Sequence, residues 1–458
     1  MIDNINQAED TVIMGKKLMT TNVRKHKKLP KGLECWPKPN GYEGILIGNE
    51  KHSLPSKYED VKKYALKKPW VWPNEIVHFL CDIHADTEAF LRSLVASNAI
   101  RRTGIADNDF KLTDEGRQGR VIIGGDCLDK GPLNLRLLRC IKSLKEKGAK
   151  VTILAGNHDL RTLAGFNYAG VKEPLFEHLL IRMGKKSIPL YMEIINEYPA
   201  ELNSILETQE TSDAKIRETL YPRESWYVEF PKLVKGSMPE ARLKKELRRI
   251  REKIGEFEEA REAAGISLQT FYAALKLAQQ LFLRPDGEFY WYFDEMLLAE
   301  KMGSFLFVHA GVDDSVAKYL FEHGIEGLND WFMKLKSNNI YELYHGPLGN
   351  CFRTKYRDMD FPLTTNGIEY LHKHGVYAIV HGHRNSLNGQ KIVLRQNMLN
   401  FECDASIDLN TRIAEGLPGT GTAVTKFSAQ GRVLGYSNDH SKIKVFDPVF
   451  FKGMTTII

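Results

Sequence analysis

The chain has 458 residues, of which 43% are hydrophobic and 27% charged, the composition of an ordinary globular protein with enough length for a full core. Its formal net charge of +6 is small for this length, so we predict no nucleic-acid partner, and the lack of an apolar run of about 18 residues predicts no membrane span. Six scattered cysteines without C-x-x-C spacing predict reduced thiols and a cytoplasmic location.

Residues 1–75 are rich in Lys, Pro and Gly and contain the aromatic residues Trp36, Trp70 and Trp72. We interpret them as an N-terminal lead-in whose later part packs on the core. The first residues lack the basic flank and apolar stretch of a secretory signal peptide. Basic clusters at 24–31 and 62–68 are better explained as solvated surface than as contacts to nucleic acid or an acidic membrane.

Between residues 76 and 160, three short apolar runs each end in a polar motif. The runs cover 76–80, 121–123 and 151–154, and the motifs are Asp82-Ile-His84, Gly125-Asp126-Cys-Leu-Asp129-Lys130-Gly131 and Gly156-Asn157-His158-Asp159. The segments 87–97 and 133–147, which follow the first two motifs, have helical spacing. This order of strand, loop and helix predicts an α/β sandwich.

Residues 161–304 are too numerous for a connecting loop. Within them, apolar residues recur at steps of four and three from Leu243 to Phe257, which is the stripe of an amphipathic helix. Gly265 interrupts the pattern, and 268–283 is again helical and more apolar. We predict an antiparallel helical hairpin at about 240–283 that projects from the core. Its stripe is either a packing seam or a docking surface for a partner protein or substrate.

Two further apolar runs, 305–308 and 376–380, end in Val308-His309-Ala310 and His381-Gly382-His383. Alternating stretches at 390–394 and 422–427 suit the second sheet of a sandwich. Strands that end in Asp, Asn or His place these side chains along one edge of a sheet, where they can converge on a metal ion. The five motifs together therefore predict one dinuclear metal site.

The order and spacing of the motifs resemble those of the calcineurin-like metallophosphoesterases, and more closely the phosphoprotein phosphatase branch. The signature of that family is D-x-H, G-D-x-x-D-R-G, G-N-H-E/D, a lone His and a late His. The resemblance covers about 76–160 and 305–440. It implies a two-sheet α/β sandwich with its core at 76–160 and 305–450, and a long helical-hairpin insertion at 161–304.

The resemblance also implies a role for each motif residue. Two divalent metal ions, Mn as the first expectation and Fe or Zn as alternatives, would hold a bridging hydroxide as the nucleophile. His158 would be the general acid, and Asp129 would orient it and raise its pKa. The implied metal ligands are Asp82 and His84 for one ion, Asp126 as a bridge, and Asn157, His309 and His383 for the other.

Several of these residues also have structural interpretations. Asp129 and Asp159 could be turn or helix-cap residues, and His309 alone could be a core histidine. For His381, our hypothesis is that it supports the metal ligands without binding a metal ion itself. We prefer the functional interpretation for Asp129 and His309 because each lies within a complete motif.

The chain departs from the family signature at Lys130, where an Arg normally grips the substrate phosphate. Lysine supplies the positive charge but not the paired N–H donors of a guanidinium. Arg161 and Arg353 are therefore candidates, with Lys130, for the substrate-binding residues. A second departure is Asn385, which replaces the second His of the G-H-x-H motif of related nucleases. Its presence favours phosphomonoester hydrolysis over nuclease activity.

We therefore predict a metallophosphatase that acts on phosphoproteins, on phosphoserine and phosphothreonine or on phosphotyrosine. One alternative is a hydrolase of small phosphate compounds such as diadenosine polyphosphates, because the motifs specify the chemistry rather than the whole substrate. Another is a catalytically dead scaffold that binds partners through the hairpin. The hairpin also resembles the helical insertions of bacterial effector phosphatases, which would place the protein in a host cytosol.

Overall fold

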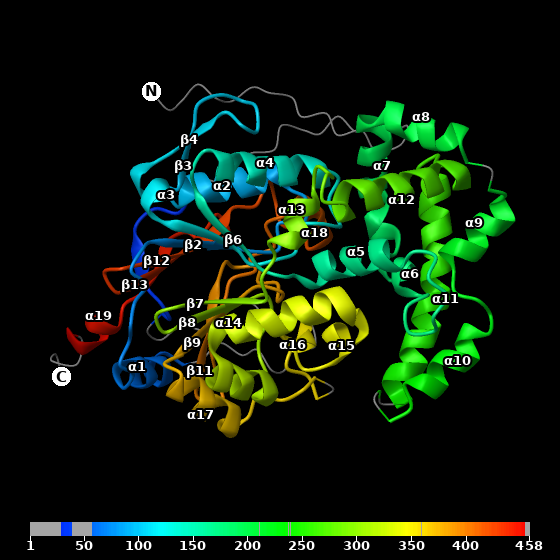
Figure 1. Ribbon diagram of the computed structural model, residues 1–458. Coiled ribbons are helices and arrows are strands. Elements are labelled where there is room, and N and C mark those ends of the chain that lie inside the picture. The colour runs from blue at the N-terminus through cyan, green and yellow to red at the C-terminus, as the bar shows by residue number, and fades with distance from the viewer. Residues whose placement is uncertain are drawn as a thin grey trace.

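The computed structural model describes residues 29–38, 57–209, 211–236, 238, 240–358 and 360–453 (Figure 1). Most of the basic cluster at 24–31, and much of the predicted lead-in, lies outside these residues. The described part of the lead-in includes helix α1 (Tyr58–Leu66) and the buried side chain of Trp36. Among the described residues, no helix combines the length and apolar character that crossing a membrane requires.

Two sheets form the centre of the molecule. The larger has seven strands in the order β1-β14-β13-β12-β2-β5-β6, in which β2, β5 and β6 run parallel and β12 pairs antiparallel with β2. Their bounds are β1 Leu33–Cys35, β14 Ile443–Phe446, β13 Arg432–Ser437, β12 Ala423–Ser428, β2 Val77–Leu80, β5 Arg120–Ile123 and β6 Lys150–Ile153. Parallel β2, β5 and β6 bring the ends of three motif-bearing strands to one edge.

The smaller sheet has five strands in the order β10-β11-β9-β8-β7, with β8, β9 and β11 parallel. Their bounds are β10 Lys391–Arg395, β11 Met398–Glu402, β9 Ala378–His381, β8 Phe305–Val308 and β7 Ala299–Met302. A separate hairpin joins β3 (Ile100–Arg102) to β4 (Phe110–Leu112). The strands β8 and β9 carry the two late motifs.

The two sheets face each other across an aromatic layer. Phe79 of β2 contacts Phe307 of β8, with ring centroids 5.6 Å apart, and Phe427 of β12 contacts Phe305 at 5.0 Å. Successive residues of a strand point to opposite faces. Accordingly Ile122 joins this layer, whereas its neighbours Val121 and Ile123 pack against helices. The predicted two-sheet α/β fold is confirmed.

Helices cover the outer faces of both sheets (Figure 1). The apolar residues of α2 and α4 share one cluster with β5, and α14 contacts β7 and α17. The bounds of these helices are α2 Thr87–Ala96, α3 Asp114–Gln118, α4 Asn134–Glu146, α14 Asp314–Asn338, α15 Ile340–His345, α16 Gly349–Arg353, α17 Thr365–Lys373, α18 Leu409–Ala414 and α19 Pro448–Gly453.

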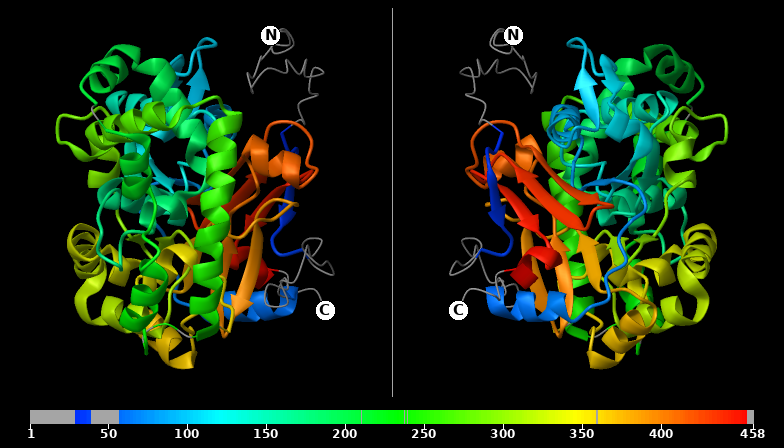
Figure 2. Two further views of the ribbon diagram at one scale, coloured as in Figure 1. Left: turned by 90° about the vertical axis from the view of Figure 1, so that its right-hand side faces the viewer. Right: turned by 90° about the vertical axis from the view of Figure 1, so that its left-hand side faces the viewer.

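A group of helices between β6 and β7 lies beside the sheets (Figure 1 and Figure 2). The bounds are α5 Asn157–Tyr168, α6 Leu179–Met183, η1 Lys185–Ser187, α7 Ile188–Glu197, α8 Pro199–Glu207, α9 Asp213–Leu220, α10 Trp226–Leu233, α11 Glu240–Ala263, α12 Leu268–Leu283 and α13 Tyr290–Asp294. Their buried apolar residues belong to the same cluster as those of α2 and α4. These helices therefore share a core with the larger sheet, and the boundaries 161 and 304 stay predictions.

Helices α11 and α12 form where the sequence predicts them, with Gly265 between them at a φ of +72°. They meet near this joint, where the rings of Phe257 and Phe271 are 5.0 Å apart. Beyond the joint they separate: α11 packs on α6, η1 and α7, whereas α12 packs on α5, α7, α8, α9 and α13. Figure 1 shows the two helices running in different directions.

The prediction of an antiparallel, projecting hairpin is therefore wrong. The reason is that each helix buries its apolar residues against other helices. The stripe of α11 is buried at Ile250 and Phe257, and α12 has nine buried residues, too many for one partner helix to cover. The alternative of a docking surface on this region stays a prediction.

Candidate metal centre

All six predicted metal ligands lie shortly after the carboxyl ends of parallel strands. Three follow β2, β5 and β6 of the larger sheet, and two follow β8 and β9 of the smaller one, with the sixth in the same loop as the first. The carboxyl ends of parallel strands are where α/β proteins bind ligands. The six residues are Asp82, His84, Asp126, Asn157, His309 and His383.

Four of these residues have a backbone in the left-handed region. The φ angles are +53° for Asp82, +46° for His84, +56° for Asp126 and +64° for His383. Non-glycine residues rarely adopt such angles, and they persist where the surrounding structure enforces them, often at functional sites. Here the first loop is held to the second: the N–H of Asp82 donates to the carbonyl of Gly125 at 3.0 Å, and that of His84 to the carbonyl of Asp126 at 2.9 Å.

The ligand atoms form two groups that share Asp126: Asp82, His84 and Asp126, and Asp126, His309 and His383. His84 Nε2 is 3.9 Å from Asp82 Oδ1 and 3.9 Å from Asp126 Oδ2. On the other side, His309 Nε2 is 3.5 Å from Asp126 Oδ2. Two atoms that each bind one ion at about 2.1 Å lie roughly 3 to 3.5 Å apart. Small shifts of these side chains would thus allow each group to hold an ion.

Asn157 lies beside the second group. Its Oδ1 lies 3.2 Å from His309 Nε2, while His309 Nδ1 donates to the carbonyl of Gly124 at 2.7 Å. A bond from one ring nitrogen to a carbonyl fixes the tautomer and leaves the other nitrogen free to bind a metal.

The charge balance of the site also fits divalent cations. Burial and the neighbouring charge of Asp126 raise the pKa of Asp82 to about 7. Burial lowers the pKa of His84 and His383 well below the ordinary value, so both imidazoles are neutral. Neutral imidazoles around buried carboxylates are the donors that divalent transition metals take. The residues present therefore fit two metal ions.

Lys130, a predicted phosphate-binding residue, lies inside this ligand set. Its Nζ is 2.6 Å from His84 Nε2, so an ammonium group lies among the predicted metal ligands. Its charge partly opposes the rise in the pKa of Asp82 and contributes to the lowered pKa of Asp126. The contact of Lys130 with a substrate phosphate stays a prediction.

The predicted pair of His158 and Asp129 is present. His158 Nδ1 lies 2.6 Å from Asp129 Oδ2, and His158 Nε2 faces Asp126 Oδ2 at 4.0 Å. The hydrogen bond and the charge of Asp129 act to raise the pKa of His158, as expected, although burial has the larger effect. Burial lowers the pKa of His158, and the charges of Asp126 and Asp129 only partly oppose this.

Asp159 has the structural role that the sequence left open. It is fully buried, and its two oxygens accept hydrogen bonds from the backbone N–H groups of Asp126, Cys127, Leu128 and Gly156 at 2.7 to 3.2 Å. It thereby fixes the loop that carries Asp126 to the start of α5. The capping interpretation is thus right for Asp159, whereas Asp129 contacts the imidazole.

The two arginines predicted to bind substrate lie beside one aromatic ring. The guanidinium of Arg161 bonds to the Tyr344 hydroxyl, and its charge acts on Asp129. The guanidinium of Arg353 lies over the Tyr344 ring at 5.2 Å. Neither the aromatic residue in α15 nor the basic residues of α6 and α11 around it follow any motif spacing in the sequence.

Three further residues support the ligands, and the sequence indicates only one of them. His381 is buried 4.0 Å from Glu402 and is in neither ligand group, consistent with a supporting position. Arg384, directly after His383, pairs with Glu402 at 2.8 Å and donates to the carbonyl of Ala310 at 3.2 Å. Glu402 was missed because its burial depends on pairing within the smaller sheet.

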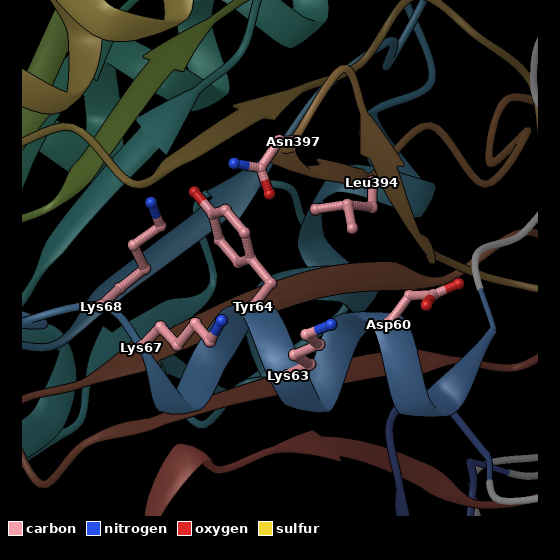
Figure 3. A pocket seen from close by; sticks show the side chains of 7 residues that line it. All are labelled: Asp60, Lys63, Tyr64, Lys67, Lys68, Leu394 and Asn397. Carbon is pink, nitrogen blue, oxygen red and sulfur yellow. The ribbon is translucent and has the colours of Figure 1, made fainter.

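A pocket of about 350 Å³ lies elsewhere, between α1 and the turn that joins β10 to β11 (Figure 3). Its lining residues are Asp60, Lys63, Tyr64, Lys67, Lys68, Leu394 and Asn397. Asn397 precedes β11, which runs parallel to β9, so the pocket is at the sheet edge opposite the carboxyl end of β9. It is therefore no part of the candidate metal centre.

Comparison with known protein families and with curated proteins found no match. Solved structures do match at low identity. A cold-active protein-tyrosine phosphatase of the psychrophile Shewanella sp. is 12% identical, with 88% of this chain and 89% of that chain covered and a TM-score of 0.42. A mutant form of a cold-active protein tyrosine phosphatase is 13% identical, with 84% of each chain covered and a TM-score of 0.43. A protein serine/threonine phosphatase from Saccharomyces cerevisiae, with similarity to human phosphatase PP5, is 10% identical, with 85% and 86% covered and a TM-score of 0.34.

Proposed function

We propose that the chain is a metal-dependent phosphomonoester hydrolase that acts on phosphoproteins. The observation that carries the proposal is the 2.6 Å contact of His158 with Asp129 next to two ligand groups that share Asp126. A buried imidazole with one nitrogen on a carboxylate, and the other facing metal ligands, is arranged to give a proton to a leaving group. A partner-binding scaffold would need neither this pair nor a complete ligand set.

The residues of the chain divide the chemistry between them. When bound, two divalent ions would supply an activated water and neutralise charge on the phosphoryl oxygens. His158 would give its Nε2 proton to the ester oxygen as the bond between phosphorus and that oxygen breaks. Asp129 would stabilise the ring while it carries both protons. Arg161, whose charge already acts on Asp129, would grip a phosphoryl oxygen.

A phosphomonoester is the preferred substrate because of the residue at position 385. Asn385 is exposed, and its Nδ2 donates to Glu415 at 2.6 Å, away from the ligand groups. It adds no ligand where related nucleases have a second histidine. Phosphoserine, phosphothreonine and phosphotyrosine all remain in the proposed class, with diadenosine polyphosphates as the alternative substrate. A cytoplasmic location, or the host cytosol for an effector, stays a prediction.

The test is phosphate release in the presence of Mn²⁺ from a phosphoserine/phosphothreonine peptide mixture, a phosphotyrosine peptide mixture and a diadenosine polyphosphate. We expect turnover of at least one peptide set. His158→Asn should keep its metal ions and lose about a hundredfold or more in kcat, because the proton donor goes while the ligands stay. Asp126→Asn should lose both activity and metal, which elemental analysis measures.

Each outcome has a defined consequence. Turnover of the dinucleotide alone would move the protein to the small-molecule alternative. Full activity of His158→Asn on a substrate with a poor leaving group would overturn the assigned mechanism. A wild-type chain that binds no metal ions and hydrolyses none of the substrates would favour the scaffold.

A further inference from the structure

A cluster of basic side chains surrounds Tyr344 next to the candidate metal centre. The guanidinium of Arg182, from α6, lies over the Tyr344 ring at 4.8 Å, on the same ring as that of Arg353. Arg242, from α11, is 3.2 Å from Nδ1 of the adjacent His345. Lys253, further along α11, donates to the carbonyl of Arg182 at 2.7 Å. We call these four basic residues the second basic cluster, to distinguish them from Lys130 and Arg161 beside the candidate metal centre. They are Arg182, Arg242, Lys253 and Arg353.

This cluster holds more positive than negative charge. Arg182 pairs with Glu246 at 3.0 Å, and the charges of Asp360 and Asp129 also act on members of the cluster. The carboxylate of Asp360 also accepts hydrogen bonds from the backbone N–H groups of Lys355 and Arg357. Within the described chain, the buried Nε of Arg353 has no hydrogen-bond partner. A buried donor without a partner is costly, and an anion bound in the cluster would supply the acceptor that this N–H needs.

The effects of this charge are visible in the neighbouring groups. Burial raises the pKa of Tyr344, but the charges of Arg161, Arg182 and Arg353 outweigh it and lower the pKa to about 8. Burial, and then the charges of Arg161 and Arg182, lower the pKa of Lys253 to about 7. Both shifts report an excess of positive charge around these groups, which a bound anion would balance.

The cluster is continuous with the candidate metal centre. Arg161 lies one turn of α5 after His158 and contacts the same Tyr344. Lys253 interacts electrostatically with both Arg161 and Asp129. The helices that carry these groups pack in series, α5 on α6 and α6 on α11 (Figure 1). An anion in the cluster would therefore be near a phosphate held at the metal centre.

From this geometry we infer that the second basic cluster binds a second phosphate of the substrate, so that the preferred substrates carry two or more phosphates close together. Guanidinium groups match phosphate oxygens through paired N–H donors, and Lys253 adds a point charge. The second phosphate has two chemical sources, a neighbouring phosphorylated residue of a protein or the chain of a free polyphosphate compound. The inference rests on the proposed function, and it assigns the helices between β6 and β7 a role in selecting substrates.

The test compares two peptides of one sequence, with one or with two phosphorylated residues at several spacings, and diadenosine tetraphosphate as the small-molecule arm. We expect wild-type kcat/KM to be roughly tenfold higher for the best doubly phosphorylated peptide, the effect of one charge-assisted hydrogen bond. Lys253→Met and Arg242→Met should each reduce that ratio about threefold or more. Preference for the tetraphosphate over every peptide would support the cluster with a free polyphosphate as its source.

The matched control is Lys244→Met, which removes a lysine charge from a side chain of α11 that is 75% exposed and pairs with Glu240. It should leave the ratio unchanged. An equal loss in Lys244→Met and Lys253→Met would overturn the inference, because general attraction to a basic helix would explain it. Equal kcat/KM for the two peptides in the wild type, and no faster hydrolysis of the tetraphosphate, would overturn the inference and leave the proposed function intact.

A separate measurement keeps the cluster testable if no phosphopeptide or tetraphosphate is hydrolysed and the proposed function fails. Inorganic tripolyphosphate is titrated calorimetrically into the metal-loaded wild type, Lys253→Met and Lys244→Met. Roughly tenfold weaker binding in Lys253→Met alone would support the cluster as a polyphosphate site. Equal binding by all three proteins would overturn it.

Discussion

Glu402 stands at the end of β11 with no exposed surface, and three cations surround its carboxylate. Arg384 is 2.8 Å away and Lys391 3.0 Å, and Arg395 forms the third ion pair. A buried charge is tolerated only when it is paired in this way. Arg384 follows His383, a predicted metal ligand, and also bonds to the carbonyl of Ala310, next to His309. The carboxylate of Glu402 therefore indirectly anchors both of these loops.

Replacement of this carboxylate should destabilise the fold in a pH-dependent way. The surrounding cations overcome burial and hold the pKa of Glu402 well below its usual range. Its contribution to stability is therefore present above the unfolded pKa and is lost as pH falls through the folded one. We expect Glu402→Gln to lower the free energy of unfolding by about 3–5 kcal/mol at pH 7. The difference from the wild type should narrow by about 1 kcal/mol at pH 3.5.

Urea denaturation at the two pH values measures this difference. The control is Glu59→Gln, which changes an exposed carboxylate of α1 and should stay within about 0.5 kcal/mol of the wild type. A Glu402→Gln protein as stable as that control would contradict the role assigned to the buried cluster.

At the scale of single residues, the sequence predicts the contacts that the family signature implies and misses those that only packing creates. His158 and Asp129 meet as the family signature implies, and Asp126 is shared between two ligand groups. No sequence motif indicates the contact of Lys130 with His84 or the position of Lys253. Both depend on how loops and helices distant in the chain come together, which residue spacing does not encode.

Two elements of the metal centre approach each other at Gly156, before α5. A Cβ added there would lie 2.1 Å from the backbone nitrogen of Asp126 and 2.2 Å from its Oδ1. Backbone atoms cannot move aside as a flexible side chain can. The end of β6 and the loop after β5 therefore fit together only because position 156 has no side chain.

Gly156→Ala should accordingly displace Asp126 and reduce kcat/KM by about a hundredfold, the effect of a misplacement near 1 Å. Metal content measured on the same protein should also fall. Gly255→Ala is the matched control, because it lies inside α11 with nothing within 4 Å of an added Cβ. It should keep full activity and raise the free energy of unfolding by about 0.5–1 kcal/mol. Full metal content in Gly156→Ala would contradict the close fit.

A helix or strand is predictable from the sequence where one apolar face packs on one neighbour. Its packing is less predictable where several neighbouring elements could cover its apolar residues. The strands before each motif and the helices after the first two form as expected. The stripe of α11 predicts a helix correctly but not its partner, because an apolar stripe fits any neighbouring apolar surface. The burial of α12 against five other helices depends on residues from 157 to 294, beyond the reach of a local pattern.

The ligand groups connect the two sheets of the molecule. Asp82, Asp126 and Asn157 follow strands of the larger sheet, whereas His309 and His383 follow strands of the smaller one. Bound ions would therefore join the sheets at one end of the aromatic layer. Without these ions, buried carboxylates such as Asp82 have too little positive charge around them to balance their own negative charge.

Chelation of the metal ions should therefore lower the unfolding temperature. An ion at 100 times its Kd stabilises the fold by about 2.7 kcal/mol, which for a chain of this size corresponds to roughly 3 °C for each ion. Thermal unfolding with and without EDTA measures the change, and added Mn²⁺ should reverse it. Asp126→Asn should not respond to EDTA. An unchanged transition in the wild type would argue against structural coupling between metal binding and the sandwich.

The strand order of the larger sheet also determines when all its strands can be paired during synthesis of the chain. Strand β12, at 423–428, lies between β13 and β2, so the edge of β2 stays unpaired until nearly the whole chain has been translated. An unpaired edge with free N–H and C=O groups is a template for association with other chains. The nascent protein thus depends on its last strands for protection from aggregation, and loss of the C-terminal quarter would expose that edge permanently.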